Sequence, residues 1–226
     1  MRSSAPRDTT AFEVREALGE AGCAVCRLSL RSVSRLIGSI AYEQVNDLDL
    51  RQQLRRAGGF CNSHAHQWLD EARSVLGTAL IYRDVLQAAL REMDSSNGAP
   101  PRRGLRGLLG GAPAEVHCPA CDAQAAAETR YIEALLAVLA AEPRLLESAD
   151  ALCRRHALAA ARAGGGAAEP VLQRSRELVA TMLAELDEVI RKEDYRFRHE
   201  PRTESERSVP RRAVAWAAGA DGLVDT

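Results

Sequence analysis

Cys23-Ala-Val-Cys26 opens the pattern that decides the fold of this chain, and Cys61-Asn-Ser-His64 follows it after 34 residues. Both motifs then return in the same order, as Cys118-Pro-Ala-Cys121 and, 31 residues later, Cys153-Arg-Arg-His156. These four motifs contain all six cysteines of the 226 residues. Repetition of the whole arrangement indicates an internal repeat.

Each repeat supplies three thiols and one imidazole, which is a complete set of ligands for tetrahedral zinc. A Cys-x-x-Cys turn aims both sulfurs at one point, and the first turn of a following helix stabilises the thiolates. We expect each metal to be held within its own half, with the halves related by a pseudo-twofold operation. The expected ligands are Cys23, Cys26, Cys61 and His64 in one half, and Cys118, Cys121, Cys153 and His156 in the other.

Zinc is the favoured metal, at two ions per chain, because the ligand set closes a structural site. An iron–sulfur cluster is the main alternative, since the same ligands can hold iron. A reactive dithiol is favoured less, because the strand and helix that usually flank such a redox motif are missing.

Composition excludes several classes of protein. A hydrophobic fraction of 46% and a charged fraction of 27% are ordinary for a globular chain and exclude a disordered one. The net charge of −1 produces no field that favours nucleic acid or anionic lipid. The longest uncharged stretch, Ser74 to Tyr82, falls far short of the roughly 20 residues of a membrane-spanning helix. The first residues lack the apolar core of a signal peptide, so we expect a cytoplasmic protein with reduced thiols.

The chain is predicted to be all-α, with two pseudo-repeated helical units, each built around a Cys3His metal site. Ala, Leu, Arg and Glu dominate, and the apolar residues recur at helical spacing. Helices are predicted at 11–18, 24–45, 49–56, 62–93, 122–141, 144–149, from about 153, at 170–195 and at 211–218. The predicted domains are a first metal-binding repeat at 1–94, a Gly/Pro/Arg linker at 95–114, a second repeat at 115–200, and a tail with a short helix at 201–226.

Three further histidines are not expected to bind metal. His66 lies close to His64, but its counterpart in the second repeat is Leu158, so the repeat selects His64. We expect His66 to rescue a loss of His64 in part. His117 and His199 are expected to lie outside the ligand sets.

The segment from Asp194 to Arg198 alternates aromatic residues with arginines, a pattern that can stack on bases or hold a phosphate. We favour a clamp across the helical body, with Tyr195 and Phe197 buried and with Arg196 and Arg198 paired to acidic residues. Contact of these four residues with an anionic ligand is the alternative.

Several segments together resemble an uncharacterised bacterial family of helical proteins with no assigned function. They are Tyr42-Glu-Gln-Val-Asn-Asp47, Gly59-Phe-Cys-Asn-Ser-His64, Ile81-Tyr-Arg-Asp84 and the C-terminal Arg191-Lys-Glu-Asp-Tyr-Arg-Phe-Arg-His-Glu-Pro201. The resemblance covers roughly residues 10 to 220. It implies a bacterial cytosolic helical protein with two cysteine-rich sites, and it implies no enzymatic activity.

The sequence therefore predicts a tandem zinc-binding protein with an interaction or scaffold role and a protein partner. It contains no hydrolase triad, phosphate-binding loop or zinc-protease motif, and closed sites leave no position for a substrate, so no catalytic residue is predicted. An iron–sulfur or dithiol electron-transfer protein is the alternative. A zinc-dependent enzyme or a nucleic-acid regulator ranks below both.

Overall fold

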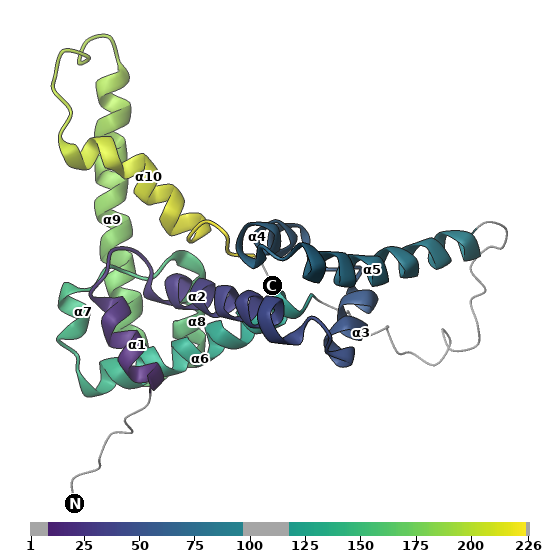
Figure 1. Cartoon of the computed structure of the whole chain (residues 1–226). Coiled ribbons are helices and arrows are strands. Elements are labelled where there is room, and N and C mark those ends of the chain that lie inside the picture. The colour runs from purple at the N-terminus through teal and green to yellow at the C-terminus, as the bar shows by residue number, and fades with distance from the viewer. Residues whose placement is uncertain (1–8, 97–117, 225–226) are drawn as a thin grey trace, which may run out of the picture. The chain divides into compact units, whose positions relative to one another are not determined.

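The computed structural model describes residues 9–96 and 118–224, and all regular structure in this part of the chain is helical (Figure 1). The all-α prediction is confirmed. Most of the predicted linker, 95–114, lies outside the described residues. The elements are α1 Thr9–Leu18, α2 Ala24–Ser39, the π-helical turn η1 Ile40–Gln44, α3 Leu48–Ala57, α4 Asn62–Ala72, α5 Val75–Ser96, α6 Pro119–Ala141, α7 Leu145–Ser148, α8 Arg154–Ala163, α9 Ala168–Glu193 and α10 Glu204–Ala218.

These helices form two compact units, and each unit draws on both halves of the sequence. Unit 1 combines Met1–Leu30 with Ala127–Leu223, and unit 2 combines Arg31–Ala126 with Val224–Thr226. The boundaries fall inside α2 and α6, so neither unit coincides with a stretch of sequence that holds one repeat. The pseudo-twofold relation between the repeats stays a prediction.

Unit 1 has a core of small and aliphatic side chains from α1, α2, α6, α8 and α9. Val14, Val25 and Leu135 are almost fully buried in it, and Tyr131 donates a hydrogen bond of 2.7 Å from its hydroxyl to Glu13. Alanines from α6 and α8, among them Ala127, Ala157 and Ala160, contribute to this core beside the larger aliphatic side chains.

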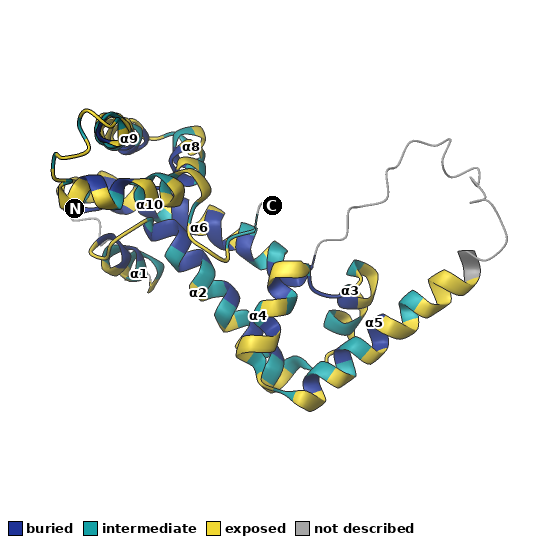
Figure 2. Cartoon of the chain, turned by 90° about the horizontal axis from the view of Figure 1, so that it is seen from above, coloured by how far each residue is buried: buried dark blue, intermediate teal, exposed yellow. Residues whose placement is uncertain are grey.

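Unit 2 is organised around Trp68, which is fully buried and stacks on Phe60 at 5.5 Å between ring centroids. The indole N–H of Trp68 donates to Thr78 at 2.9 Å. α3 packs beside the first half of α5, where Ile81 and Val85 are buried, whereas most residues further along α5 are exposed (Figure 2). The indole therefore links α4 to the start of α5.

The long helix predicted at 62–93 is two helices in the structure, and this prediction was wrong. Arg73 adopts a left-handed backbone conformation with φ +44°, which ends α4. The hydroxyl of Ser74 then accepts a hydrogen bond of 3.0 Å from the N–H of Gly77 and starts α5 as an N-terminal cap. The apolar residues keep one helical period through the break, which is why periodicity alone joined the two helices.

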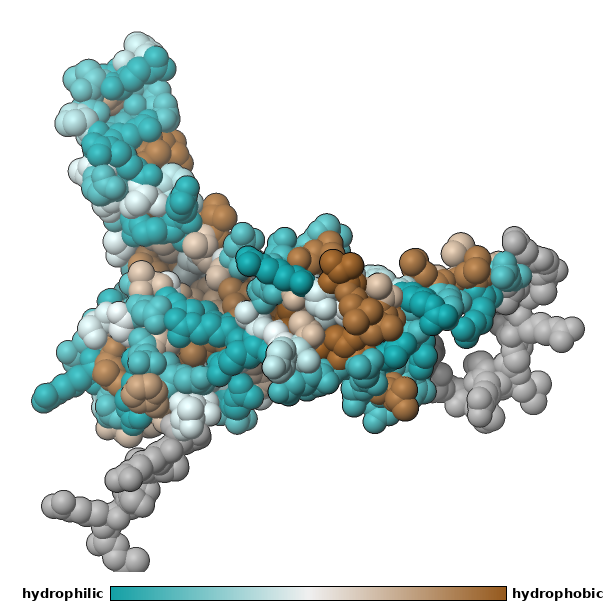
Figure 3. All heavy atoms as spheres, viewed as in Figure 1, coloured by the Kyte–Doolittle hydropathy of each residue, from teal (hydrophilic) through white to brown (hydrophobic). Residues whose placement is uncertain are grey.

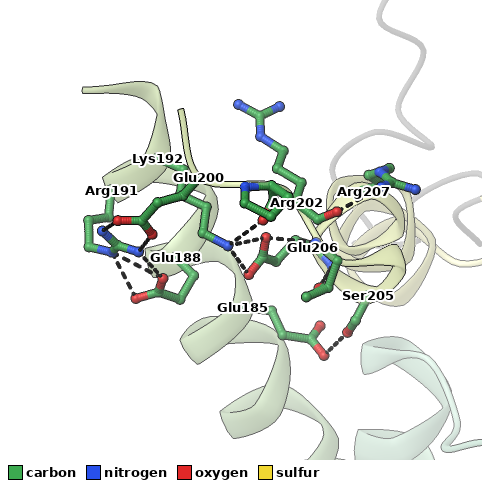
Figure 4. Close-up of polar contacts among 11 residues, drawn as sticks. Glu185, Glu188, Arg191, Lys192, Glu200, Arg202, Ser205, Glu206 and Arg207 are labelled. Carbon is green, nitrogen blue, oxygen red and sulfur yellow. Dashed lines mark hydrogen bonds and ion pairs between the residues drawn. The ribbon is translucent and has the colours of Figure 1, made fainter. Parts of the chain in front are cut away.

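α9 and α10 form a hairpin that is closed by charged side chains (Figure 4). Lys192, the one lysine of the chain, is buried and donates to both carboxylate oxygens of Glu206 at 2.7 Å and to the carbonyl of Pro201 at 3.1 Å. Glu206 also accepts from the backbone N–H of Thr203, whose hydroxyl accepts in return from the N–H of Glu206. This capping box starts α10 seven residues before the predicted 211–218.

Candidate metal centres

Two groups of cysteine and histidine side chains converge in the structure, one in each unit. In both groups the four ligand atoms lie within 4.8 Å of one another. The first cluster, in unit 1, comprises Cys23, Cys26, Cys153 and His156; the second cluster, in unit 2, comprises Cys61, His64, Cys118 and Cys121. All eight residues predicted as metal ligands thus belong to one group or the other.

The prediction that each ligand set closes within its own half is wrong. The Cys-x-x-Cys pair of one half meets the Cys-x-x-His pair of the other half in both clusters. From Cys26 the chain runs about 30 Å outward through α2 and η1, at 1.5 Å per residue, and α3 returns only about 15 Å. The return is therefore too short to bring Cys61 back to Cys23, because most of it is helical rather than extended.

Every ligand pair stands at the start of a helix. Cys61 and Cys153 are the residues just before α4 and α8, where their extended backbones leave the thiols uninvolved in capping. The histidines follow in the first turn, and the Cys-x-x-Cys pairs occupy the same places on α2 and α6. Each cluster thus joins two helix N-termini, whose positive dipole ends stabilise thiolates.

Distances in the first cluster agree with a tetrahedral ligand set. Zinc–sulfur bonds of about 2.3 Å place the sulfurs of such a site about 3.8 Å apart. The sulfurs of Cys26 and Cys153 are 3.6 Å apart, and Nδ1 of His156 lies 3.3–3.4 Å from all three sulfurs. Nδ1 is therefore the nitrogen that would bind the metal, and Nε2 points away from it.

The surroundings of the first cluster hold its imidazole and cover its sulfurs. Nε2 of His156 lies 3.6 Å from the buried carboxylate of Glu128, which also pairs with Arg155 at 2.7 Å. Burial lowers the pKa of His156, but hydrogen bonds with Cys153, Cys23 and Glu128 outweigh burial and raise this pKa to about 11. The hydrogen bonds from Cys23, Cys26 and His156 lower the pKa of Cys153 against burial, which favours the thiolate form that a metal requires.

Gly219, the residue after α10, approaches the first cluster closely. Its backbone has φ +87°, a conformation that favours glycine. A methyl group there would lie 3.6 Å from the sulfur of Cys26 and 3.9 Å from that of Cys153. The C-terminal end of α10 therefore covers these two sulfurs, and Cys23 remains half-buried.

The second cluster has the same ligand geometry. Its sulfurs are 3.2 Å apart between Cys118 and Cys121 and 3.6 Å apart between Cys121 and Cys61. Nδ1 of His64 lies 3.2–3.4 Å from the three sulfurs. Burial raises the pKa of Cys118, but hydrogen bonds from His64, Cys61 and Cys121 outweigh it and lower this pKa to about 6.

The second cluster differs from the first behind its histidine. Nε2 is buried without a hydrogen-bond partner among the described residues in both His64 and His156, but only Nε2 of His156 has a carboxylate beside it, that of Glu128 at 3.6 Å. Cys61 and Cys121 are both half-buried, whereas only Cys23 is half-buried in the first cluster. The second cluster is thus less covered, and its imidazole has no carboxylate partner among the described residues.

His66 and His199 take no part in either cluster. His66 is exposed on α4, and two residues along a helix amount to about 200° of rotation, so it faces away from His64. The expected rescue by His66 therefore has no geometric basis. His199 is exposed, and His117 lies outside the described residues.

The aromatic and basic segment after α9 stands at the tip of the hairpin. Tyr195 is 82% exposed, so the prediction that it is buried was wrong. Phe197 is half-buried and lies beneath the guanidinium groups of Arg191 and Arg196, at 4.8 and 5.4 Å from its ring centre. Arg196 pairs with Asp194 at 2.7 Å, and Arg198 is exposed. The stacking is local to the hairpin tip, and contact of these four residues with an anionic ligand stays a prediction.

Comparison with known proteins agrees with the resemblance found in the sequence. Residues 8–105 match the model of a family of unknown function (DUF6062). The chain is also 28% identical over 203 residues to "Uncharacterized 23.9 kDa protein in xynA 3'region" from Caldicellulosiruptor sp. (strain Rt8B.4), an alignment that covers 87% of this chain and 95% of that protein. No solved structure matches the chain.

Proposed function

We propose that each cluster binds one zinc ion and that the protein is a helical scaffold held together by these two metals. The observation that carries the proposal is the convergence of three sulfurs and one imidazole nitrogen within 4.8 Å in both clusters. Cysteine and histidine ligands suit zinc, and all six cysteines are free thiols rather than disulfides. A reducing, cytoplasmic setting would keep them so.

The proposed metals are structural. Three thiolates and one imidazole fill all four positions of a tetrahedral ion, so no position remains for water or substrate. Each ion would instead join helix starts that are more than 50 residues apart in the chain, α2 to α8 and α4 to α6. Structural zinc contributes an apparent 10–16 kcal/mol or so in zinc-finger peptides, so such crosslinks would stabilise both units.

An interaction role is supported by the uncovered side of α5. Leu76, Leu86, Leu90 and Met93 are each 58–71% exposed, and brown side chains gather along this helix in Figure 3. Together with Ala79 and Arg83 they are spaced by alternating steps of three and four residues, as in helices that pack on a partner helix. Exposed apolar patches of this kind are typical of protein contact surfaces.

Elemental analysis and an absorption spectrum of protein purified without oxygen test the proposal. Two zinc ions per chain and a colourless solution are expected. A brown protein that contains iron and labile sulfide would replace the zinc proposal with an iron–sulfur electron-transfer protein. A protein without metal whose thiols oxidise reversibly would instead favour the dithiol alternative.

A further inference from the structure

A cavity of about 360 Å³ opens among α8, α9 and α10 in unit 1, outside the ligand sets of the two clusters. Its wall is almost entirely apolar. The principal side chains are Leu158, Leu172, Val179, Leu183 and Trp216. This size and this lining are those of pockets that bind small organic molecules.

The apolar wall is incompletely covered by the protein itself. Leu158 is 41% exposed and Leu183 is 56% exposed, although both face the cavity. α8 has 10 residues against 26 in α9, so it covers only part of the apolar side of its longer neighbour. A ligand with an apolar chain or ring would remove these surfaces from water.

The indole of Trp216 also lines the cavity. Its Nε1 is buried and has no acceptor among the residues that the structure describes. A buried donor without a partner is rare in folded proteins, and a bound ligand is one of the ways in which such a group is satisfied. A ligand that carries an acceptor and reaches Nε1 would satisfy this donor.

The positive charge of Arg154 favours a ligand whose acceptor is negatively charged. Three arginines lie near this part of the unit, but Arg176 is paired with Glu169, and Arg212 with Glu185. Arg154 lines the cavity, is exposed, and forms no hydrogen bond or ion pair with the described residues. A guanidinium group at the edge of an apolar pocket suits a carboxylate, which it can bind through two hydrogen bonds.

We propose that this pocket binds a small amphipathic carboxylate, with its apolar chain or ring against the leucines and valine of α8 and α9. The carboxylate accepts from Nε1 of Trp216 and pairs with Arg154. The inference goes beyond the zinc scaffold and does not depend on which metal the clusters hold.

Trp216 places the proposed pocket next to the surroundings of the first cluster. A second cavity, of about 470 Å³, shares Trp216 with the first and is lined by Cys23 and Cys153. Arg154 directly follows Cys153 in the chain. Binding therefore alters the environment of Trp216, whose fluorescence is a direct readout.

The test is a titration of the full-length protein, with its metal content measured beforehand. Octanoate, 1-octanol, octylamine and acetate are added separately, and tryptophan emission and isothermal calorimetry are recorded. Octanoate is expected to give a saturable change, octanol and octylamine to bind at least about tenfold more weakly, and acetate to give none. Trp68 is the other tryptophan, and its buried position in unit 2 should leave its emission unchanged.

Three variants locate the site. Arg154→Gln and Trp216→Phe are each expected to weaken octanoate binding about tenfold by calorimetry, because each removes one contact to the carboxylate. Arg162→Gln changes an exposed arginine in the last turn of α8 that does not line the cavity, and it is expected to bind normally. Helical circular dichroism and metal content check that all three variants are folded.

The proposal is overturned if octanoate gives no saturable signal with fully metallated, folded protein. Equal affinities for octanoate and octanol would overturn the carboxylate assignment. Unchanged octanoate binding in both Arg154→Gln and Trp216→Phe would exclude this pocket as the site.

Discussion

The two clusters share one ligand set and differ in what surrounds it. In the first, a carboxylate stands 3.6 Å behind the imidazole of His156, and Gly219 closes over two sulfurs. In the second, no carboxylate among the described residues stands behind the imidazole of His64, and two of three cysteines are half-buried. The ligands decide which kind of metal suits a site, whereas the surroundings decide how firmly it is held and how readily reagents reach it. We therefore expect the second cluster to lose metal first.

The largest expected effect comes from paired cysteine substitutions that test which ligands share an ion. Cys26→Ser with Cys153→Ser removes two ligands from the first cluster only, so the chain should keep one of two metals. Cys26→Ser with Cys61→Ser damages both clusters and should lose both metals, with a much lower melting temperature. Native mass spectrometry counts the ions.

Ligand sets that close within one half of the sequence would reverse these two results. The single variants Cys26→Ser and Cys61→Ser are the controls, and each should lose one metal. Metal counts that follow sequence halves rather than the two units would refute the observed pairing.

Glu128→Gln should weaken metal binding at the first cluster by roughly 10–100-fold, the range found when a carboxylate behind a metal-bound histidine is removed. The amide is uncharged and cannot stabilise the imidazole in the same way. Competition with a coloured chelator measures the affinity of each cluster. Arg155→Gln is the matched control, because it removes the partner of Glu128 and leaves the carboxylate in place. An equal loss at the second cluster would contradict the role given to Glu128.

Gly219→Ala should lower stability by about 1–3 kcal/mol, since its backbone, with φ +87° and ψ −170°, is strained for any residue with a Cβ. Gly164→Ala is a close control. Gly164 follows α8 with φ +73° and ψ −164°, and a methyl group there meets nothing within 4 Å. Both variants should lose similar stability in thermal unfolding, and Gly219→Ala alone should release metal faster from the first cluster. Equal release rates would show that Gly219 does not protect the sulfurs.

The smallest expected effect is a loss of stability of the hairpin formed by α9 and α10 at low pH. The hydrogen bond from Lys192 holds the pKa of Glu206 below its usual value near 4.5. The stabilisation is fully present above the usual value and is lost as the pH falls through the lower folded value. The protection of the amides in α9 and α10, measured against their intrinsic exchange rates at each pH, should therefore begin to fall below about pH 4.5, before the folded-state pKa of Glu206 is reached. Glu206→Gln should show the lower protection already at neutral pH and a smaller further loss on acidification, which is due to Glu185 and Glu200, whose pKa values are also lowered.

Sequence reasoning identified the helical class and the eight clustered residues because both depend on patterns within short stretches of sequence. Cys-x-x-Cys and Cys-x-x-His place two ligands on one helical turn, so each pair is visible without the fold. No short-range pattern in the sequence indicates that Cys23 lies beside Cys153. This pairing depends on how far α2 and α3 carry the chain, and that distance follows from which residues between Cys26 and Cys61 are helical.

The parts that sequence reasoning missed are set by tertiary contacts. Glu128 is one of many glutamates on amphipathic helices, and nothing adjacent to it in the chain relates it to His156. Gly219 follows a predicted helix as glycines commonly do, and its nearness to Cys26 appears only once α10 is packed. The break at Arg73 was hidden because apolar residues continue in phase on both sides, although Ser74 before Gly77 is a capping signal that could have revealed it.

Acylation of Lys192 can report on opening of the hairpin formed by α9 and α10. Twenty-nine of the 30 basic residues are arginine, so an acylating reagent that attacks amines meets one side-chain ammonium and the N-terminus. That ammonium is buried and bonded to Glu206 and Pro201, so the folded hairpin shields it from acylation. The rate of acylation of Lys192 therefore measures how often α9 and α10 separate. The measurement needs no introduced probe.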